Sequence, residues 1–194
     1  NSLRAFETAL SFPEVTTLEL DVVISKDHKV VVSHEPWMNP TICVTDSVIN
    51  DSIGRAMNLY QMTLEEIQKY DCGMAQHPDF PEQKNGSSFK PSLKQVLEFT
   101  ADDWPGFTIE TKTSPKGDGL YHPGPVKFAK ILAAELKEMD AAYPEVDLMR
   151  KVTIQSFDVR TLRAYRKMHL GVKLSLLTDQ NTSPDELMDE LGFP

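Results

Sequence analysis

Residues 16–35 read TTLELDVVISKDHKVVVSHE, and this stretch decides the fold. Its first part, Thr16–Ile24, is apolar and rich in β-branched residues, which predicts a strand. A polar turn follows, and Val30–His34 predicts a second strand. Glu19 and Asp21 are two residues apart, so they share one face of the first strand while leucine and valine occupy the other.

Helices and strands alternate along the rest of the chain. The expected helices are 2–11, 92–100, 126–139, 158–168 and 185–191, and the further strands are 106–112, 152–157 and 172–177. Strands separated by helices predict an α/β fold with a parallel sheet, open or closed into a barrel. A (β/α)8 TIM barrel typically takes about 250 residues. We therefore expect 1–194 to be one barrel domain seen incomplete, without its first strand and its last βα units.

Irregular structure interrupts this alternation at about 36–91, directly after the strand that carries His34. The segment is rich in proline, and its one predicted helix, Thr63–Tyr70, opens with a capping box formed by Thr63 and Glu66. A stretch of this length exceeds an ordinary loop, which predicts an insertion with a functional role.

Charge and composition exclude several classes of protein. The chain has 20 Lys and Arg against 29 Asp and Glu, a net charge of −9, and such a surface repels nucleic acid. No apolar run reaches the roughly 18 residues of a membrane span, so we expect no transmembrane segment. Cys43 and Cys72 fit either a disulfide in an oxidising compartment or two free thiols, and we favour free thiols. The sequence does not indicate an oligomeric state.

Ionisable residues lie near the ends of three predicted strands. Glu19 and Asp21 are in the first, His34 ends the second, and Glu110 and Lys112 end the strand 106–112. Such groups within apolar strands are costly unless they are paired or bind a metal. A parallel barrel keeps its active site at the carboxyl ends of its strands. Three carboxylates directed at one point suit a hard cation, Mg²⁺ or Ca²⁺.

Each pattern alone also has a purely structural interpretation. Glu19 and Asp21 could each take part in a structural ion pair or face solvent, His34 could be an ordinary packed histidine, and Glu110 with Lys112 could form a buried salt bridge. The coincidence of all three patterns at equivalent topological positions favours a functional site.

Several motifs in order resemble the glycerophosphodiester phosphodiesterase family. They are NSLRAF at 1–6, ELDV at 19–22, KD at 26–27, VVSHE at 31–35, IETK at 109–112 and QSFD at 155–158. The family pattern reads HRG, PENTLxAF, ExDV, TKDG, VxxHD and ExK. The HRG motif would precede Asn1, and Glu35 stands where the family has aspartate.

The resemblance implies a hydrolase that cleaves small-molecule glycerophosphodiesters to sn-glycerol 3-phosphate and an alcohol. It implies that Glu19, Asp21 and Glu110 hold the divalent cation and that Lys112 neutralises the phosphate. His34 and an upstream histidine would exchange the roles of general acid and base through a cyclic phosphate.

Two other functions stay open at this point. A phospholipase C or D acting on intact lipid would need apolar residues at the site mouth, for which Trp37, Met38 and Phe80 are candidates. A non-catalytic or inactive domain of the same fold is the other alternative. We expect a periplasmic or secreted location rather than a cytoplasmic one.

Overall fold

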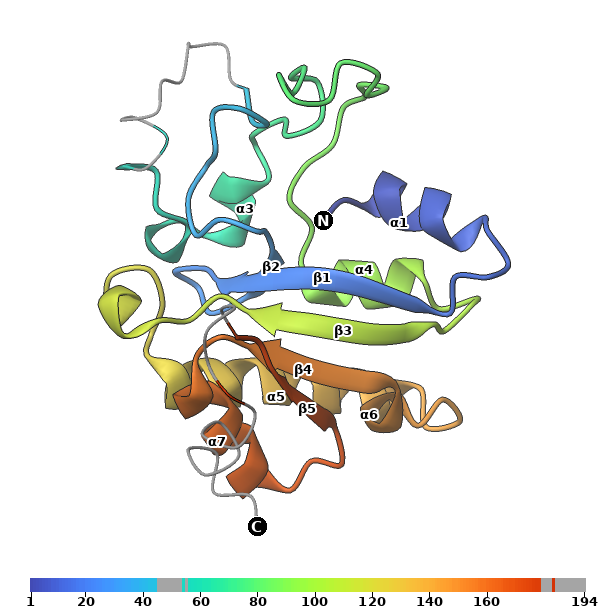
Figure 1. Cartoon of the computed structure of the whole chain (residues 1–194), viewed down its shortest axis with the longest axis vertical. Helices are drawn as coiled ribbons and strands as arrows, with labels where there is room; N and C mark the ends of the chain where they lie inside the picture. The colour runs from blue at the N-terminus through green and yellow to red at the C-terminus, as the bar shows by residue number, and fades with distance from the viewer. Residues whose placement is uncertain (45–53, 55, 179–182, 184–194) are drawn as a thin grey trace.

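One open, mostly parallel sheet organises the molecule (Figure 1). The computed structural model describes residues 1–44, 54, 56–178 and 183. Its strands run in the order β2-β1-β3-β4-β5. Their bounds are β1 Thr17–Ile24, β2 Val30–Val32, β3 Gly106–Thr111, β4 Val152–Ser156 and β5 Lys173–Leu176. Strands β1, β3, β4 and β5 are parallel, and the sheet does not close among these residues. The predicted incomplete α/β barrel is confirmed.

All the described helices except the short one in the insertion contribute to the main core, which lies on one face of the sheet (Figure 1). The helices are α1 Leu3–Leu10, α3 Leu64–Ile67, α4 Leu93–Phe99, α5 Pro125–Ala142, α6 Leu148–Lys151 and α7 Val159–Met168, with 3₁₀ turns η1 Leu59–Gln61 and η2 Pro115–Gly117. Leu18, Leu20 and Val22 of β1 pack in this core with Ile109 and Phe128. Because strand side chains alternate, Glu19, Asp21 and Glu110 project from the opposite face. None of the helices in the described residues is long and apolar enough to span a bilayer.

Polar side chains cap the starts of α1, α3, α4 and α7. Ser2 accepts a hydrogen bond from the backbone of Ala5, and Ser92 and Gln95 complete a capping box at α4. The box between Thr63 and Glu66 also forms, although α3 is shorter than predicted. The short helix α6 was not expected from the sequence, and the predicted helix 185–191 lies outside the described residues.

Strand β2 departs from the parallel arrangement expected for the sheet. It runs antiparallel to β1, with Val32 opposite Val22, because the short turn between them cannot make the crossover that parallel strands need. It also ends two residues before the predicted end. Beyond it, the Ser33 amide donates to the Asp21 carbonyl at 3.0 Å. This bond still brings His34 alongside the carboxylates of β1.

The insertion forms a second, smaller core together with side chains of β1 and β2. Its buried members are Val23, Val31, Met38, Cys43, Leu59 and Ile67. Cys43 and Cys72 form a disulfide across 29 positions of sequence, so the interpretation as free thiols is wrong. The backbone amide of Val44 donates to the Asp71 carbonyl at 2.7 Å and brings the two cysteine-bearing segments together. Sequence spacing alone could not reveal that proximity.

Candidate active site

Three carboxylates converge on the face of the sheet opposite the main core. Asp21 and Glu110 are directly paired in the register of β1 and β3, and Glu19 lies two residues earlier on the same face of β1. One ligand oxygen from each lies within 4.8 Å of the others. The predicted convergence is therefore present. Glu19 is exposed, whereas Asp21 and Glu110 are buried.

The donor set fits a divalent cation. Oxygens bound to one Mg²⁺ or Ca²⁺ at about 2.0–2.6 Å lie at most about 5 Å apart, so the observed spread needs no movement of the backbone. All three donors are carboxylates, the ligand type that hard cations prefer.

Lys112 lies against two of these carboxylates. Its Nζ is 2.8 Å from Asp21 Oδ1 and 2.8 Å from Glu110 Oε1. These contacts raise the pKa of Lys112 above its usual value, although its partial burial opposes the shift. The salt bridge considered from the sequence is thus present, and it involves two of the three carboxylates that are candidate metal ligands.

The surroundings shift the pKa values of the three carboxylates in different directions. Partial desolvation by the surrounding protein is the main cause of a raised pKa at both Glu19 and Glu110, and the negative charge of Asp21 adds to it. Burial also opposes ionisation of Asp21, but hydrogen bonds from Lys112 and Asn1 outweigh it and lower the pKa of that carboxyl. One lysine does not neutralise three carboxylates, so a bound cation would reduce the repulsion that remains among them.

His34 lies beside the cluster on the turn after β2. Its side chain is 64% exposed, and its Nδ1 is 3.2 Å from Glu35 Oε1. Asn39 donates to the same Glu35 oxygen at 3.1 Å. The charge of His34 contributes to lowering the pKa of Asp21, which reflects their proximity. The imidazole is accessible and has a carboxylate partner at one nitrogen.

Residues 1–191 match the glycerophosphoryl diester phosphodiesterase family. The chain belongs to this family. A glycerophosphodiester phosphodiesterase from Caldanaerobacter subterraneus is 29% identical to it over 177 residues, which are 91% of this chain and 60% of that protein. A relative from Bacillus subtilis is 24% identical over 185 residues, 93% of this chain and 61% of the relative. The chain therefore spans about three fifths of the length of these curated relatives.

Solved structures confirm the barrel fold of this family member. A phosphodiesterase from Oleispira antarctica, in complex with the product sn-glycerol-3-phosphate, superposes with a TM-score of 0.70 at 18% identity, covering 100% of this chain and 66% of that one. A glycerophosphodiester phosphodiesterase from Thermotoga maritima gives 0.57 at 22% identity, covering 100% and 64%. The five-stranded open sheet thus corresponds to part of a TIM barrel.

Asn1 is a site residue that sequence reasoning missed. Its Nδ2 donates to Asp21 Oδ2 at 2.7 Å, and its Oδ1 accepts the backbone amide of Asp21 at 2.9 Å. It does not cap α1, a role that Ser2 performs. The only available signal was the family resemblance, in which Asn1 matches the asparagine of the PENT motif.

Gln155 is the second missed residue. It is paired with Glu110 in the register of β3 and β4, and its Nε2 donates to Glu19 Oε1 at 3.0 Å. The match to the family's QSF motif pointed to this strand end but assigned no role to the glutamine. Gln155 from β4 and Asn1 from the N-terminal segment therefore each hold one carboxylate of the cluster, Glu19 and Asp21 respectively.

A cavity of about 360 Å³ adjoins the cluster through Glu110 and Lys112. Its aromatic lining comprises Trp37, Tyr121 and Phe157. The Trp37 and Tyr121 rings are 5.6 Å apart at an angle of 58°. Apolar walls beside a charged centre are typical of ligand sites.

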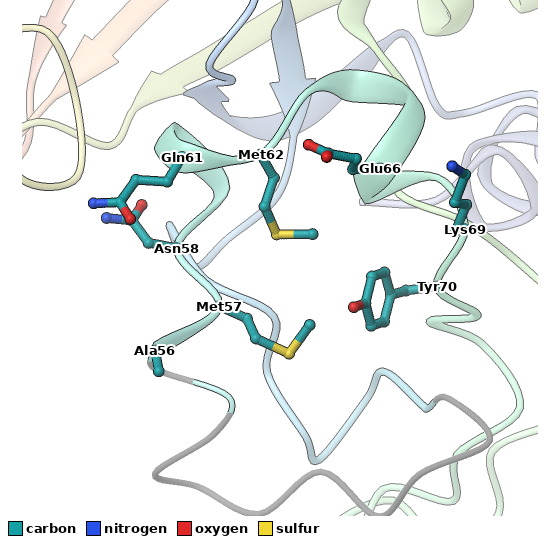
Figure 2. A pocket seen from close by; sticks show the side chains of 8 residues that line it. All are labelled: Ala56, Met57, Asn58, Gln61, Met62, Glu66, Lys69 and Tyr70. Carbon is teal, nitrogen blue, oxygen red and sulfur yellow. The ribbon is translucent and has the colours of Figure 1, made fainter.

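Figure 2 shows a second, separate pocket beside η1 and α3. Met57, Met62 and Tyr70 line it with five other residues, and none of the predicted site residues is among them. The chemistry of the carboxylate cluster therefore belongs with the first cavity.

Proposed function

We propose that this protein hydrolyses glycerophosphodiesters to sn-glycerol 3-phosphate and an alcohol with the help of a bound divalent cation. The observation that carries the proposal is the convergence of three carboxylates with Lys112 and His34 in a member of this family. The product sn-glycerol-3-phosphate in the Oleispira antarctica structure supports the choice of substrate class.

Glu19, Asp21 and Glu110 would hold the cation, Mg²⁺ or Ca²⁺. When bound, the cation lowers the pKa of a substrate hydroxyl and offsets negative charge on the phosphate. Lys112 pairs with two of these carboxylates, so a bound cation would compete with the lysine for them. Lys112, once released from Asp21 and Glu110, can neutralise the phosphate as a point charge.

His34 would transfer protons at Nε2, because Nδ1 is engaged by Glu35. As a glycerol hydroxyl attacks phosphorus, the bond from phosphorus to the alcohol oxygen breaks, and His34 gives that oxygen a proton. His34 then takes a proton from the water that opens the resulting cyclic phosphate. The family resemblance assigns the complementary proton transfers to a histidine ahead of Asn1.

The cavity beside Glu110 and Lys112 is the proposed place of the alcohol group. Trp37 brings the insertion into this wall, while Tyr121 and Phe157 come from the loops after β3 and β4. This arrangement supports a role of the insertion in the choice of alcohol.

The test uses the complete natural chain with glycerophosphocholine, and glycerol 3-phosphate is measured enzymatically. We expect release that stops with EDTA and resumes with Mg²⁺ or Ca²⁺, and we expect Glu110→Gln to abolish it. Glu98→Gln, an exposed change on α4, is the matched control and should leave the rate unchanged. Undiminished release in EDTA, or release of phosphocholine in place of glycerol 3-phosphate, would contradict the proposal.

Action on intact phospholipid has weaker support. Met38 is fully buried in the core of the insertion, and Trp37 contacts Tyr121 in the cavity wall. Phe80 is 61% exposed but does not line that cavity. Parallel assays on glycerophosphocholine and phosphatidylcholine vesicles separate the two activities, and we expect turnover of the first only.

A periplasmic or secreted location is also part of the proposal. The bond between Cys43 and Cys72 supports it, since disulfides persist in oxidising compartments. Fractionation of the native cells, followed by thiol labelling, tests it. Reduced cysteines in a cytoplasmic fraction would count against it.

A further inference from the structure

Lys90 is a buried charge that the proposed mechanism does not use. It is 4% exposed, and it is the one buried lysine among the residues that the structure describes. Burial lowers its pKa to about 8, while the nearby charge of Glu35 opposes the shift. A buried ammonium is costly unless its partners compensate for it, so the location of those partners indicates its role.

The Lys90 ammonium is directed at the turn that carries His34. Its Nζ donates to Ser33 Oγ at 2.8 Å, and Ser33 Oγ in turn donates to the Glu35 carbonyl at 2.6 Å. The two bonds form a chain from the lysine across the residues on both sides of His34. Hydrogen bonds in such chains polarise and strengthen one another.

Glu35 supplies the second half of the network. Its Oε1 meets His34 Nδ1 and Asn39 Nδ2, while its Oε2 is buried without a hydrogen-bond partner. The positive charge of Lys90 lies near enough to Glu35 to offset part of the charge of this half-satisfied carboxylate. Losing Lys90 would leave Glu35 free to seek another partner and to release the His34 ring.

The backbone around Lys90 is fixed on both sides. Its carbonyl accepts from Gln68 Nε2 at 3.2 Å, and the next carbonyl, that of Pro91, accepts from the Val32 amide at 2.8 Å. The lysine is thus anchored to β2 itself. A side chain held this firmly, and aimed at a neighbouring turn, suits a positioning role rather than a mobile one.

We infer that Lys90 is a positioning residue, which holds Ser33 and Glu35 so that the His34 imidazole is aimed at the reacting phosphodiester. This inference rests on the proposed function, because His34 matters only if it transfers protons. Partners that orient a reacting side chain typically contribute about 10- to 100-fold to activity.

The first experiment is a kinetic double-mutant cycle on the complete natural chain with glycerophosphocholine. Lys90→Met should lower kcat by about 10- to 100-fold and leave KM within about twofold. In a His34→Ala background the same change should not lower kcat any further. Ser33→Ala should imitate Lys90→Met, and Ser33→Thr, which keeps the hydroxyl, should restore the rate. Lys94→Met, an exposed lysine on α4, is the matched control.

Three results would overturn the inference. A raised KM with normal kcat would make Lys90 a substrate-binding group. An equal loss of kcat in the His34→Ala background would show that Lys90 acts through a residue other than His34. If Lys90→Met does not fold, the comparison of Ser33→Ala with Ser33→Thr replaces it. A normal kcat for Ser33→Ala would then refute the positioning role of Lys90.

A spectroscopic readout separates this inference from the proposed function. If the unaltered chain proves inactive on every glycerophosphodiester, the proposed function fails, yet the ring ¹⁵N signals of His34 still report its contact with Glu35. Lys90→Met and Ser33→Ala should shift those signals, and Lys94→Met should not. Unchanged signals in the first two variants would refute the coupling of Lys90 to His34.

Discussion

The side chain of Asn1 makes a sharp test of how the carboxylate cluster is built. Asn1→Ala removes two hydrogen bonds to Asp21, one to its carboxylate at 2.7 Å and one to its backbone amide at 2.9 Å. A hydrogen bond to a charged group contributes about 1.5–3 kcal/mol. At about 1.4 kcal/mol per tenfold change, affinity for a divalent cation should fall by about 10- to 100-fold. Asp21 would lose its orientation but keep its charge.

Calorimetric titration of the metal-free complete chain with Mg²⁺ and Ca²⁺ measures this loss. Ser2→Ala is the matched control, since it removes the cap of α1 and costs about 0.5–2 kcal/mol of stability. The cation affinity of Ser2→Ala should be unchanged. Asn1→Ala should bind the cation weakly and keep a near-normal melting temperature. A cation affinity within twofold of the unaltered chain for Asn1→Ala would refute the reasoning.

Three further predictions concern catalysis, the disulfide and pH. His34→Ala should lower kcat by about 10²–10⁴-fold with little change in melting temperature, and retention of more than about a third of the rate would show a structural histidine. Replacing Cys43 and Cys72 by serine should lower the free energy of unfolding by about 3–4 kcal/mol in chemical denaturation, as expected for a cross-link over 29 positions, and an unchanged midpoint would contradict it. Burial lowers the pKa of His122 below 6.5, and its Nδ1 accepts from the Gly124 amide. The unfolded chain therefore takes up this proton first, so stability should fall as pH drops below about 6.5. His122→Gln should flatten that dependence in denaturation curves at pH 5 and pH 7, and an equally steep fall would exclude His122 as its source.

Local patterns in the sequence were enough to place most elements. The alternation in β1 separates Leu18 and Leu20 from Glu19 and Asp21, and the structure keeps that division between core and site. Ser92 and Asp158 begin their helices as predicted. Such features depend on side-chain periodicity and on hydrogen bonds a few residues apart, which the order of residues states directly.

The sequence motifs also predicted much of the site. Their order identified the family, and the strand-end positions of Glu19, Asp21 and Glu110 predicted their convergence. That prediction succeeded because parallel strands in register bring equivalent positions side by side, as β1 and β3 do for Asp21 and Glu110.

Only the tertiary structure decided which distant residues meet. Asn1 reaches Asp21 across 20 positions, Lys90 reaches Ser33 across 57, and Gln155 reaches Glu19 across 136. No local pattern encodes these contacts, because they depend on how the whole chain packs and compensates its buried charges. The sequence by itself determined which face of each strand is polar, and packing decided which partners that polar face acquires.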